Sequence, residues 1–442
     1  LIEGNLNQSL IEYFKQYDNK YHKVSTLFDH LRKNQALIFY HFTKDQSPGN
    51  SDFRYVTQYE IFMIKRNKKG KLLFTNYSSS LEDKEELINL YYRFGMVHNE
   101  EDGAEKLLVD EKSRLYTSLL QNQTSPPNHE AFFQNDNEDT RTAISSDYTG
   151  LNLSLYMLLI KPIRSFINES DYLTIIPDPV ISNIPFETLI DWDNEDIFDS
   201  YDTLLDKFES INYANSFGEF LDYNSISNTT KKINLFGNID YESNSNILLS
   251  KRGYNSLSNL QWSKNEIYDI GKIFKESAII EGEQATETIL KKTDFSELDA
   301  IHFAMHGINF EEDYRRSSLV FLSDLSNDGM LTFDEIIELD LSNIDLITLS
   351  ACSTNRSKLF SGLSHLSLQH AFKLAGAKNV ISTMWEIDDK ASYFFMKEYY
   401  QLLKKHKNPT ITLSKTKRYF IKKYPQYSSP HYWGAFVIYG SY

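Results

Sequence analysis

The chain has 442 residues, 41% hydrophobic and 24% charged, which is an ordinary soluble composition and enough for two or three domains. Its 46 Lys and Arg against 61 Asp and Glu give a formal charge of −15, which argues against direct nucleic-acid binding, a function that needs a basic face. No apolar run reaches the roughly 18 residues of a membrane-spanning helix, and the first residues do not resemble a signal peptide.

Hydrophobic periodicity divides the first half of the chain. Residues 1–35 carry apolar side chains at helical spacing, and the run at 36–42 opens a series of strand-like segments separated by polar turns. In chain order we expect strands at 36–42, 59–66 and 71–76, a helix at 81–95, a polar loop at 121–140, a helix at 150–167, a strand at 172–178, and a turn leading into a short helix at 179–191.

From about residue 205 the pattern alternates between strand and helix. We expect strands at 233–240, 277–282, 300–307, 317–324, 345–352, 378–385 and 431–440. We expect helices at 263–275, 286–292, 329–339, 365–377, 389–405 and 410–423. Apolar strands that alternate with helices indicate a mainly parallel sheet covered on both faces, in which ligands bind beyond the carboxyl ends of the strands.

Two of these strands end in residues that carry chemistry. AIHFAMHG ends at His306 and Gly307, and DLITLSAC ends at Cys352. A neighbouring imidazole can take the thiol proton and so activate the sulfur as a nucleophile. The backbone N–H groups of Gly307 and Cys352 are candidate donors for the oxyanion that forms on attack.

Other interpretations of the same residues stay open. Cys352 is the one cysteine in the chain, so it forms no intrachain disulfide and no multi-thiolate zinc site, and a cysteine that ends an apolar strand is often inert and buried. His302 shares a strand face with His306 and is interpreted as structural. His365 and His370 lack metal-ligand spacing, so neither a metal nor a cofactor is expected.

Four ordered blocks of the sequence resemble the CHAT family, caspase-like cysteine peptidases that are often fused to tetratricopeptide repeats and are distant relatives of caspases and separase. The blocks are HFAMHG (302–307), LSACST (349–354), HAFKLAGAKNVISTMWEIDD (370–389) and PHYWGAFVIYG (430–440). A weaker resemblance reaches back to about residue 36. The resemblance implies a caspase-like, mainly parallel α/β sheet flanked by helices, with a Cys–His dyad in which His306 and Cys352 match the family's pair.

The resemblance also implies a domain organisation. Residues 206–442 would form the catalytic caspase-like domain. Residues 36–205 would form a pseudo-caspase-like α/β subdomain that positions substrate. Residues 1–35 would be a helical segment that ends a repeat array, and because the chain does not begin with Met we expect that it continues upstream.

Substrate specificity is expected at the acidic turn after the strand 378–385. Separase, with a similar Trp-acidic stretch, selects basic residues, and a carboxylate pairs well with Arg or Lys. Glu386, Asp388 and Asp389 are therefore candidates for the pocket that binds the side chain before the cleaved bond (S1). The alternative is that Asp388 and Asp389 cap the helix that follows.

The family resemblance implies a regulated endopeptidase that cleaves a protein, either gasdermin-like or a dedicated partner. A partner that engages upstream repeats would activate it, within a bacterial defence or cell-death system in the cytoplasm. Low basal activity is then expected. The alternatives are a catalytically silent caspase-like scaffold and a Cys-based acyltransferase, and no phosphate-binding Gly-rich loop favours the latter.

Overall fold

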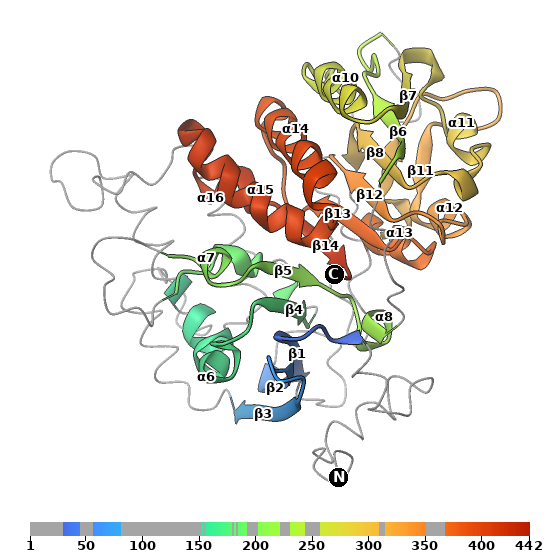
Figure 1. The fold of residues 1–442 in the computed structure, drawn as a ribbon. Coiled ribbons are helices and arrows are strands. Elements are labelled where there is room, and N and C mark those ends of the chain that lie inside the picture. The colour runs from blue at the N-terminus through green and yellow to red at the C-terminus, as the bar shows by residue number, and fades with distance from the viewer. Residues whose placement is uncertain are drawn as a thin grey trace, which may run out of the picture. The chain divides into compact units, whose positions relative to one another are not determined.

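The computed structural model describes residues 30–44, 56–80, 152–153, 155–178, 181–182, 184–191, 202–221, 230–243, 257–308, 314–350 and 367–442 (Figure 1). The chain divides into two compact units, which are residues 1–223 with 360–364 and residues 224–359 with 365–442. The expected helices at 1–35 and 81–95 and the loop at 121–140 lie outside the described residues, apart from the last few residues of the first segment.

The first unit holds strands in the order β3-β2-β1-β4-β5. β1, β2 and β3 are antiparallel, whereas β4 runs parallel to β1 and β5 parallel to β4. The strands are β1 (Gln35–Lys44), β2 (Val56–Arg66), β3 (Leu72–Ser80), β4 (Tyr172–Ile176) and β5 (Ser210–Tyr213). The helical segments are η2 (Lys161–Ile163), α6 (Arg164–Ile167), η4 (Phe186–Thr188), α7 (Leu204–Lys207) and α8 (Phe217–Leu221).

Alternation of apolar side chains explains the strands of the first unit. Leu37 and Phe39 of β1 pack with Phe62 of β2 and Phe217 of α8 in one buried cluster. The four predicted strands of this half, at 36–42, 59–66, 71–76 and 172–178, are confirmed.

The second unit holds strands in the order β14-β13-β12-β8-β6-β7. All are parallel except β14, which pairs antiparallel with β13. The strands are β6 (Lys232–Gly237), β7 (Glu276–Glu281), β8 (Ala300–Ala304), β12 (Leu346–Leu349), β13 (Asn379–Thr383) and β14 (Phe436–Gly440). A separate antiparallel sheet joins β9 (Gly307–Ile308), β10 (Ser318–Val320) and β11 (Met330–Thr332).

Helices cover both faces of the larger sheet. The longer helices are α10 (Ser263–Ile273), α14 (Asp389–His406) and α15 (Pro409–Lys423). The shorter ones are η5 (Gly282–Gln284), α11 (Glu287–Lys291), η6 (Phe295–Glu297), η7 (Tyr314–Arg316), α12 (Phe333–Ile337), α13 (Leu368–Leu374), η8 (Pro425–Tyr427) and α16 (Pro430–Trp433). Alternate side chains of β8 show the two faces, because Phe303 packs with Phe372 of α13 whereas His302 contacts Tyr400 of α14.

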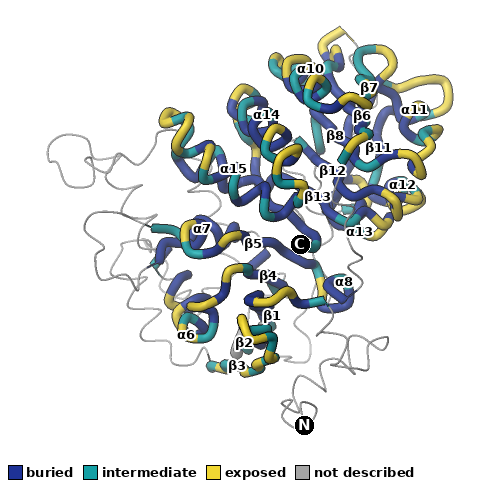
Figure 2. The backbone as a smooth tube through the Cα atoms, viewed as in Figure 1, coloured by how far each residue is buried: buried dark blue, intermediate teal, exposed yellow. Residues whose placement is uncertain are grey.

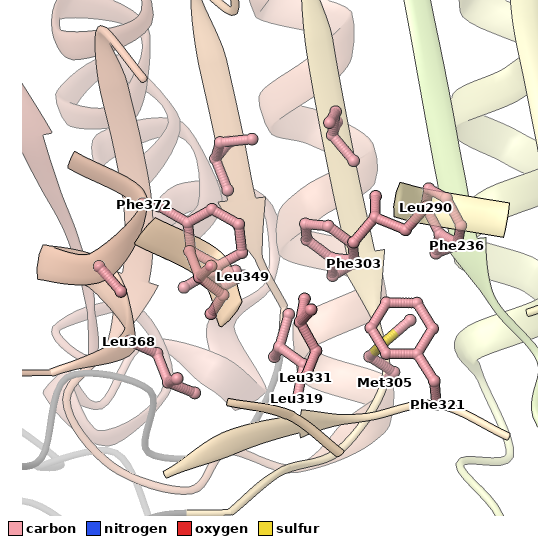
Figure 3. Packing of buried hydrophobic residues seen from close by; sticks show 14 of the residues in the cluster. Phe236, Leu290, Phe303, Met305, Leu319, Phe321, Leu331, Leu349, Leu368 and Phe372 are labelled. Atoms are coloured by element: carbon pink, nitrogen blue, oxygen red, sulfur yellow. The ribbon is translucent and has the colours of Figure 1, made fainter. Parts of the chain in front are cut away.

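The core of the second unit combines aliphatic side chains with phenylalanine rings that pack on the central strands (Figure 3). Phe303 stacks on Phe236 of β6 with ring centroids 5.4 Å apart, and lies 5.7 Å from the ring of Phe372. Burying one such side chain stabilises the fold by about 1.5–3 kcal/mol. The residues of β8, β12 and β13 are all buried, so these strands give the loops at their carboxyl ends a rigid base (Figure 2).

Candidate active site

His306 and Cys352 follow two neighbouring parallel strands that are in register. Phe303 of β8 is paired with Leu349 of β12, and the N–H of Ser350 donates to the Phe303 carbonyl over 2.9 Å. His306 lies three residues beyond Phe303, and the sequence places Cys352 three residues beyond Leu349. Both strands therefore direct the chain toward the same edge of the sheet. Cys352 itself lies outside the described residues.

The imidazole of His306 is half-buried and is oriented by a backbone carbonyl. Its Nε2 lies 2.7 Å from the carbonyl oxygen of Ser258. A carbonyl oxygen can only accept a hydrogen bond, so in this geometry Nε2 carries the proton. In the neutral ring Nδ1 is then the nitrogen that can take up a proton.

The surroundings favour the neutral form of this ring. Burial lowers the pKa of His306 below its usual 6.5, while the hydrogen bond to the Ser258 carbonyl and the negative charge of Glu386 oppose that shift. An imidazole with a lowered pKa is mostly unprotonated at neutral pH, which is the state a general base requires.

Gly307, the residue after this histidine, has its N–H directed away from the small sheet. In the pairing of β9 with β10, the Val320 N–H donates to the His306 carbonyl over 2.9 Å, and Leu319 is opposite Gly307. Hydrogen-bonded and non-bonded pairs alternate in an antiparallel ladder, so the Gly307 N–H points away from β10. It is thus geometrically suited to donate to an oxyanion beside His306.

The match to a known family covers most of the chain. The family model described as the CHAT domain matches residues 152–441. The chain belongs to the CHAT family. This confirms the resemblance on which the sequence interpretation rested, and with it the caspase-like, mainly parallel sheet flanked by helices.

Several solved structures match this CHAT protein at low sequence identity. Separase of Saccharomyces cerevisiae, in a complex with securin, is 14% identical with a TM-score of 0.45, and the match covers 94% of this chain and 30% of that one. Gingipain R, an Arg-specific cysteine proteinase, is 10% identical with a TM-score of 0.41, and the match covers 76% of each chain. The CHAT chain therefore spans less than a third of the separase chain. No curated protein matches it in sequence.

Two of the three candidate S1 carboxylates in the CHAT domain bind backbone groups. Asp388 is the N-cap of α14, and its Oδ1 accepts the N–H of Ala391 over 2.8 Å. Asp389 accepts the N–H of Trp262 over 2.7 Å at the start of α10, and burial raises its pKa. Glu386 is exposed, and its negative charge raises the pKa of His306, against the larger lowering by burial. The geometry thus gives Asp388 the capping contact of the alternative interpretation, whereas Asp389 binds the start of a different helix, α10, and Glu386 is the carboxylate of this turn whose charge influences His306.

The second histidine of β8 is part of a buried network on the sheet face covered by α10 and α14. His302 is fully buried, with Nε2 2.8 Å from Glu266 and Nδ1 3.2 Å from the hydroxyl of Tyr400. That hydroxyl donates to Thr348 of β12 over 2.9 Å. The contacts fit the structural role expected for His302, since they tie β8 and β12 to their covering helices.

Ser258 is the contributor that the sequence interpretation missed. Ser258 contacts the imidazole through its main-chain carbonyl, a group that every residue type has, so the sequence carries no signal for this contact. Among the described residues there is no cluster of three or more His, Cys, Asp or Glu side chains placed to hold a metal ion. His370 is buried in α13, and His365 lies outside the described residues. No helix in the described ranges is long and apolar enough to cross a membrane.

Proposed function

We propose that the chain is a cysteine endopeptidase in which Cys352 is the nucleophile and His306 the general base. One observation carries the proposal: an imidazole, oriented through Nε2 by the Ser258 carbonyl, follows a strand in register with the strand that leads to the one cysteine. The CHAT family and its cysteine-peptidase-like fold support the same chemistry.

The reaction needs only groups of this chain, the peptide and one water. Nδ1 of His306 takes the thiol proton, and the Cys352 thiolate attacks the scissile carbonyl carbon. The oxyanion would accept hydrogen bonds from the N–H groups of Gly307 and Cys352. Collapse breaks the C–N bond, the amine leaves with the proton from His306, and water activated by the same imidazole hydrolyses the thioester.

The proposed substrate is a protein with a basic residue before the cleaved bond. Glu386 is exposed beside the imidazole, and Asp388 and Asp389 add two negative charges to the same turn. A carboxylate of this kind favours Arg or Lys over neutral side chains. In this arrangement Glu386 makes the direct contact, while Asp388 and Asp389 shape the turn.

The biological setting is proposed from the family alone. The substrate would be a gasdermin-like protein or a dedicated partner, in a bacterial defence or cell-death system in the cytoplasm. A partner bound to repeats upstream of residue 1 would activate the peptidase, so the chain by itself would show low basal activity.

Mapping of new protein N-termini across the proteome tests the proposal directly. Cells that express the chain and its activating partner are compared with cells that carry Cys352→Ala, and we expect new termini only with the wild type, mainly after Arg or Lys. The Cys352→Ser variant, with a weaker nucleophile, is the matched control and should behave like Cys352→Ala. A Cys352→Ala strain that retains every new terminus and every cellular effect would instead favour a scaffold.

A further inference from the structure

A tyrosine hydroxyl replaces one hydrogen bond of the strand ladder beside His306. The Val320 N–H donates to the His306 carbonyl, and in a regular antiparallel pair the reciprocal bond would run from the His306 N–H to the Val320 carbonyl. The hydroxyl of Tyr241 lies between these two groups. It accepts the His306 N–H over 3.3 Å and donates to the Val320 carbonyl over 2.7 Å.

The ring of Tyr241 also contacts the imidazole. The two ring centroids are 4.8 Å apart at an interplanar angle of 63°, an edge-to-face arrangement, and Tyr241 is only 6% exposed. Tyr241 therefore limits both the backbone and the ring of His306, although it lies far away in sequence.

Asn259 connects Tyr241 to the carbonyl that orients the imidazole. Its Oδ1 accepts the N–H of Tyr241 over 2.7 Å and that of Glu242 over 3.2 Å, and its Nδ2 donates to Asp240 over 3.0 Å. The N–H of Asn259 itself donates to Glu242 over 3.2 Å. Since Ser258 is the preceding residue, the side chain of Asn259 links the segment that carries the Ser258 carbonyl to Tyr241, and both of these groups contact His306.

We propose that Tyr241 and Asn259 are positioning residues that hold the His306 imidazole with its proton on Nε2 and Nδ1 directed to the nucleophile. The proposal rests on the proposed dyad of His306 and Cys352. Neither positioning residue contacts a reacting atom, so each acts through His306. Loss of the Tyr241 hydroxyl leaves a buried N–H and a buried carbonyl without their partner, and loss of the Asn259 amide releases the segment that carries the Ser258 carbonyl.

The single thiol of the chain makes this testable without a substrate. Alkylation by iodoacetamide, followed by intact mass between about pH 5 and about pH 10, reports the reactivity of Cys352. We expect the wild type to be alkylated at neutral pH faster than a free thiol, because Nδ1 of His306 takes the thiol proton as the sulfur reacts, and His306→Ala to slow alkylation toward that of a free thiol with a pKa of about 8.5. Tyr241→Phe, which keeps the ring, and Asn259→Ala should fall between, with alkylation at neutral pH about twofold to tenfold slower than in the wild type.

Tyr268→Phe is the matched control. It removes a hydroxyl that donates to Glu281 over 2.6 Å on the exposed side of α10, and its profile should equal that of the wild type. Circular dichroism and the unfolding midpoint of each variant show whether it is folded. If Tyr241→Phe and Asn259→Ala match the wild type while His306→Ala differs, the positioning role is overturned and the dyad stands. If His306→Ala also matches the wild type, the dyad itself is overturned.

Discussion

At the scale of single residues, His306 is held by hydrogen bonds to three separate segments of the chain, at Tyr241, Ser258 and Val320. His306 and Cys352 could be named as candidates because each ends an apolar strand in the sequence and carries a reactive side chain. The Ser258 carbonyl and the Tyr241 hydroxyl could not, because one is a backbone atom and the other depends on a ladder bond displaced by a residue from a separate segment. The acidic turn could be located, but only the structure shows that Asp388 and Asp389 accept backbone N–H groups at the starts of two helices.

The pH dependence of peptide cleavage follows from the charge beside His306. The neutral imidazole is the active form, so kcat/KM should fall as the pH drops through the pKa of His306, which lies below 6.5. Glu386→Gln removes a negative charge that stabilises the protonated ring, so the acid limb should move to lower pH. The measurement is kcat/KM against pH on the substrate found by N-terminal mapping.

Glu276→Gln, an exposed carboxylate on β7, controls for the change in net charge and should leave the acid limb in place. If the acid limb does not move in Glu386→Gln, the charge of Glu386 does not influence the pKa that sets this limb, and the prediction is wrong.

At the scale of elements, the sequence predicted most of the described strands, the short β10 and β12 among them, and missed β5, β9 and β11. β6, β8 and β13 were predicted because continuous apolar runs bounded by polar turns are a strong signal. β5, and the strands β9 and β11 of the small sheet, have two to four residues, so the periodic signal of each is weak. Their pairing depends on distant partners, so tertiary context alone defines them.

Substitutions of Asp388, the N-cap of α14, distinguish a role in capping the helix from a role in binding substrate. Asp388→Ala removes the acceptor for the Ala391 N–H and should lower the free energy of unfolding by about 1 kcal/mol, as measured by urea denaturation. Asp388→Asn keeps a capping oxygen and loses the charge, so it should unfold close to the wild type.

The same two variants test whether Asp388 also contributes to substrate specificity. If Asp388→Asn retains its stability but loses the preference for Arg or Lys in a peptide library, then Asp388 binds the substrate in addition to its cap. If both variants keep that preference, the selecting charge belongs elsewhere on the turn, with Glu386 the first candidate.

At the scale of the whole chain, four motifs were enough to predict the family, and the family model extends the match back to residue 152. The motifs lie around the carboxyl ends of β8, β12 and β13, where chemistry limits the choice of residue. The upstream strands are limited mainly by packing, which many apolar residues satisfy, so the resemblance there is weaker.

The net charge predicts how cleavage depends on salt. A chain with a formal charge of −15 attracts a basic substrate over a long range, and salt screens that attraction. We expect kcat/KM on an Arg- or Lys-containing peptide to fall several-fold between about 50 and about 300 mM NaCl, mostly through KM. A peptide of the same length with acidic flanking residues should show the opposite trend, and equal slopes for both would argue against electrostatic selection.

The pairing register of β8 and β12 determines which insertions and deletions the fold tolerates. Between these strands the chain passes through the small sheet and a turn at 322–329, whose Leu325 is fully exposed. Residues added at the exposed tip of that turn leave Phe303 opposite Leu349, so we expect the fold to tolerate an insertion there. Deletion of a single codon within 346–349 would turn the later side chains of β12 to the opposite face of the sheet, and we expect it to abolish the proposed hydrolysis with both His306 and Cys352 still encoded.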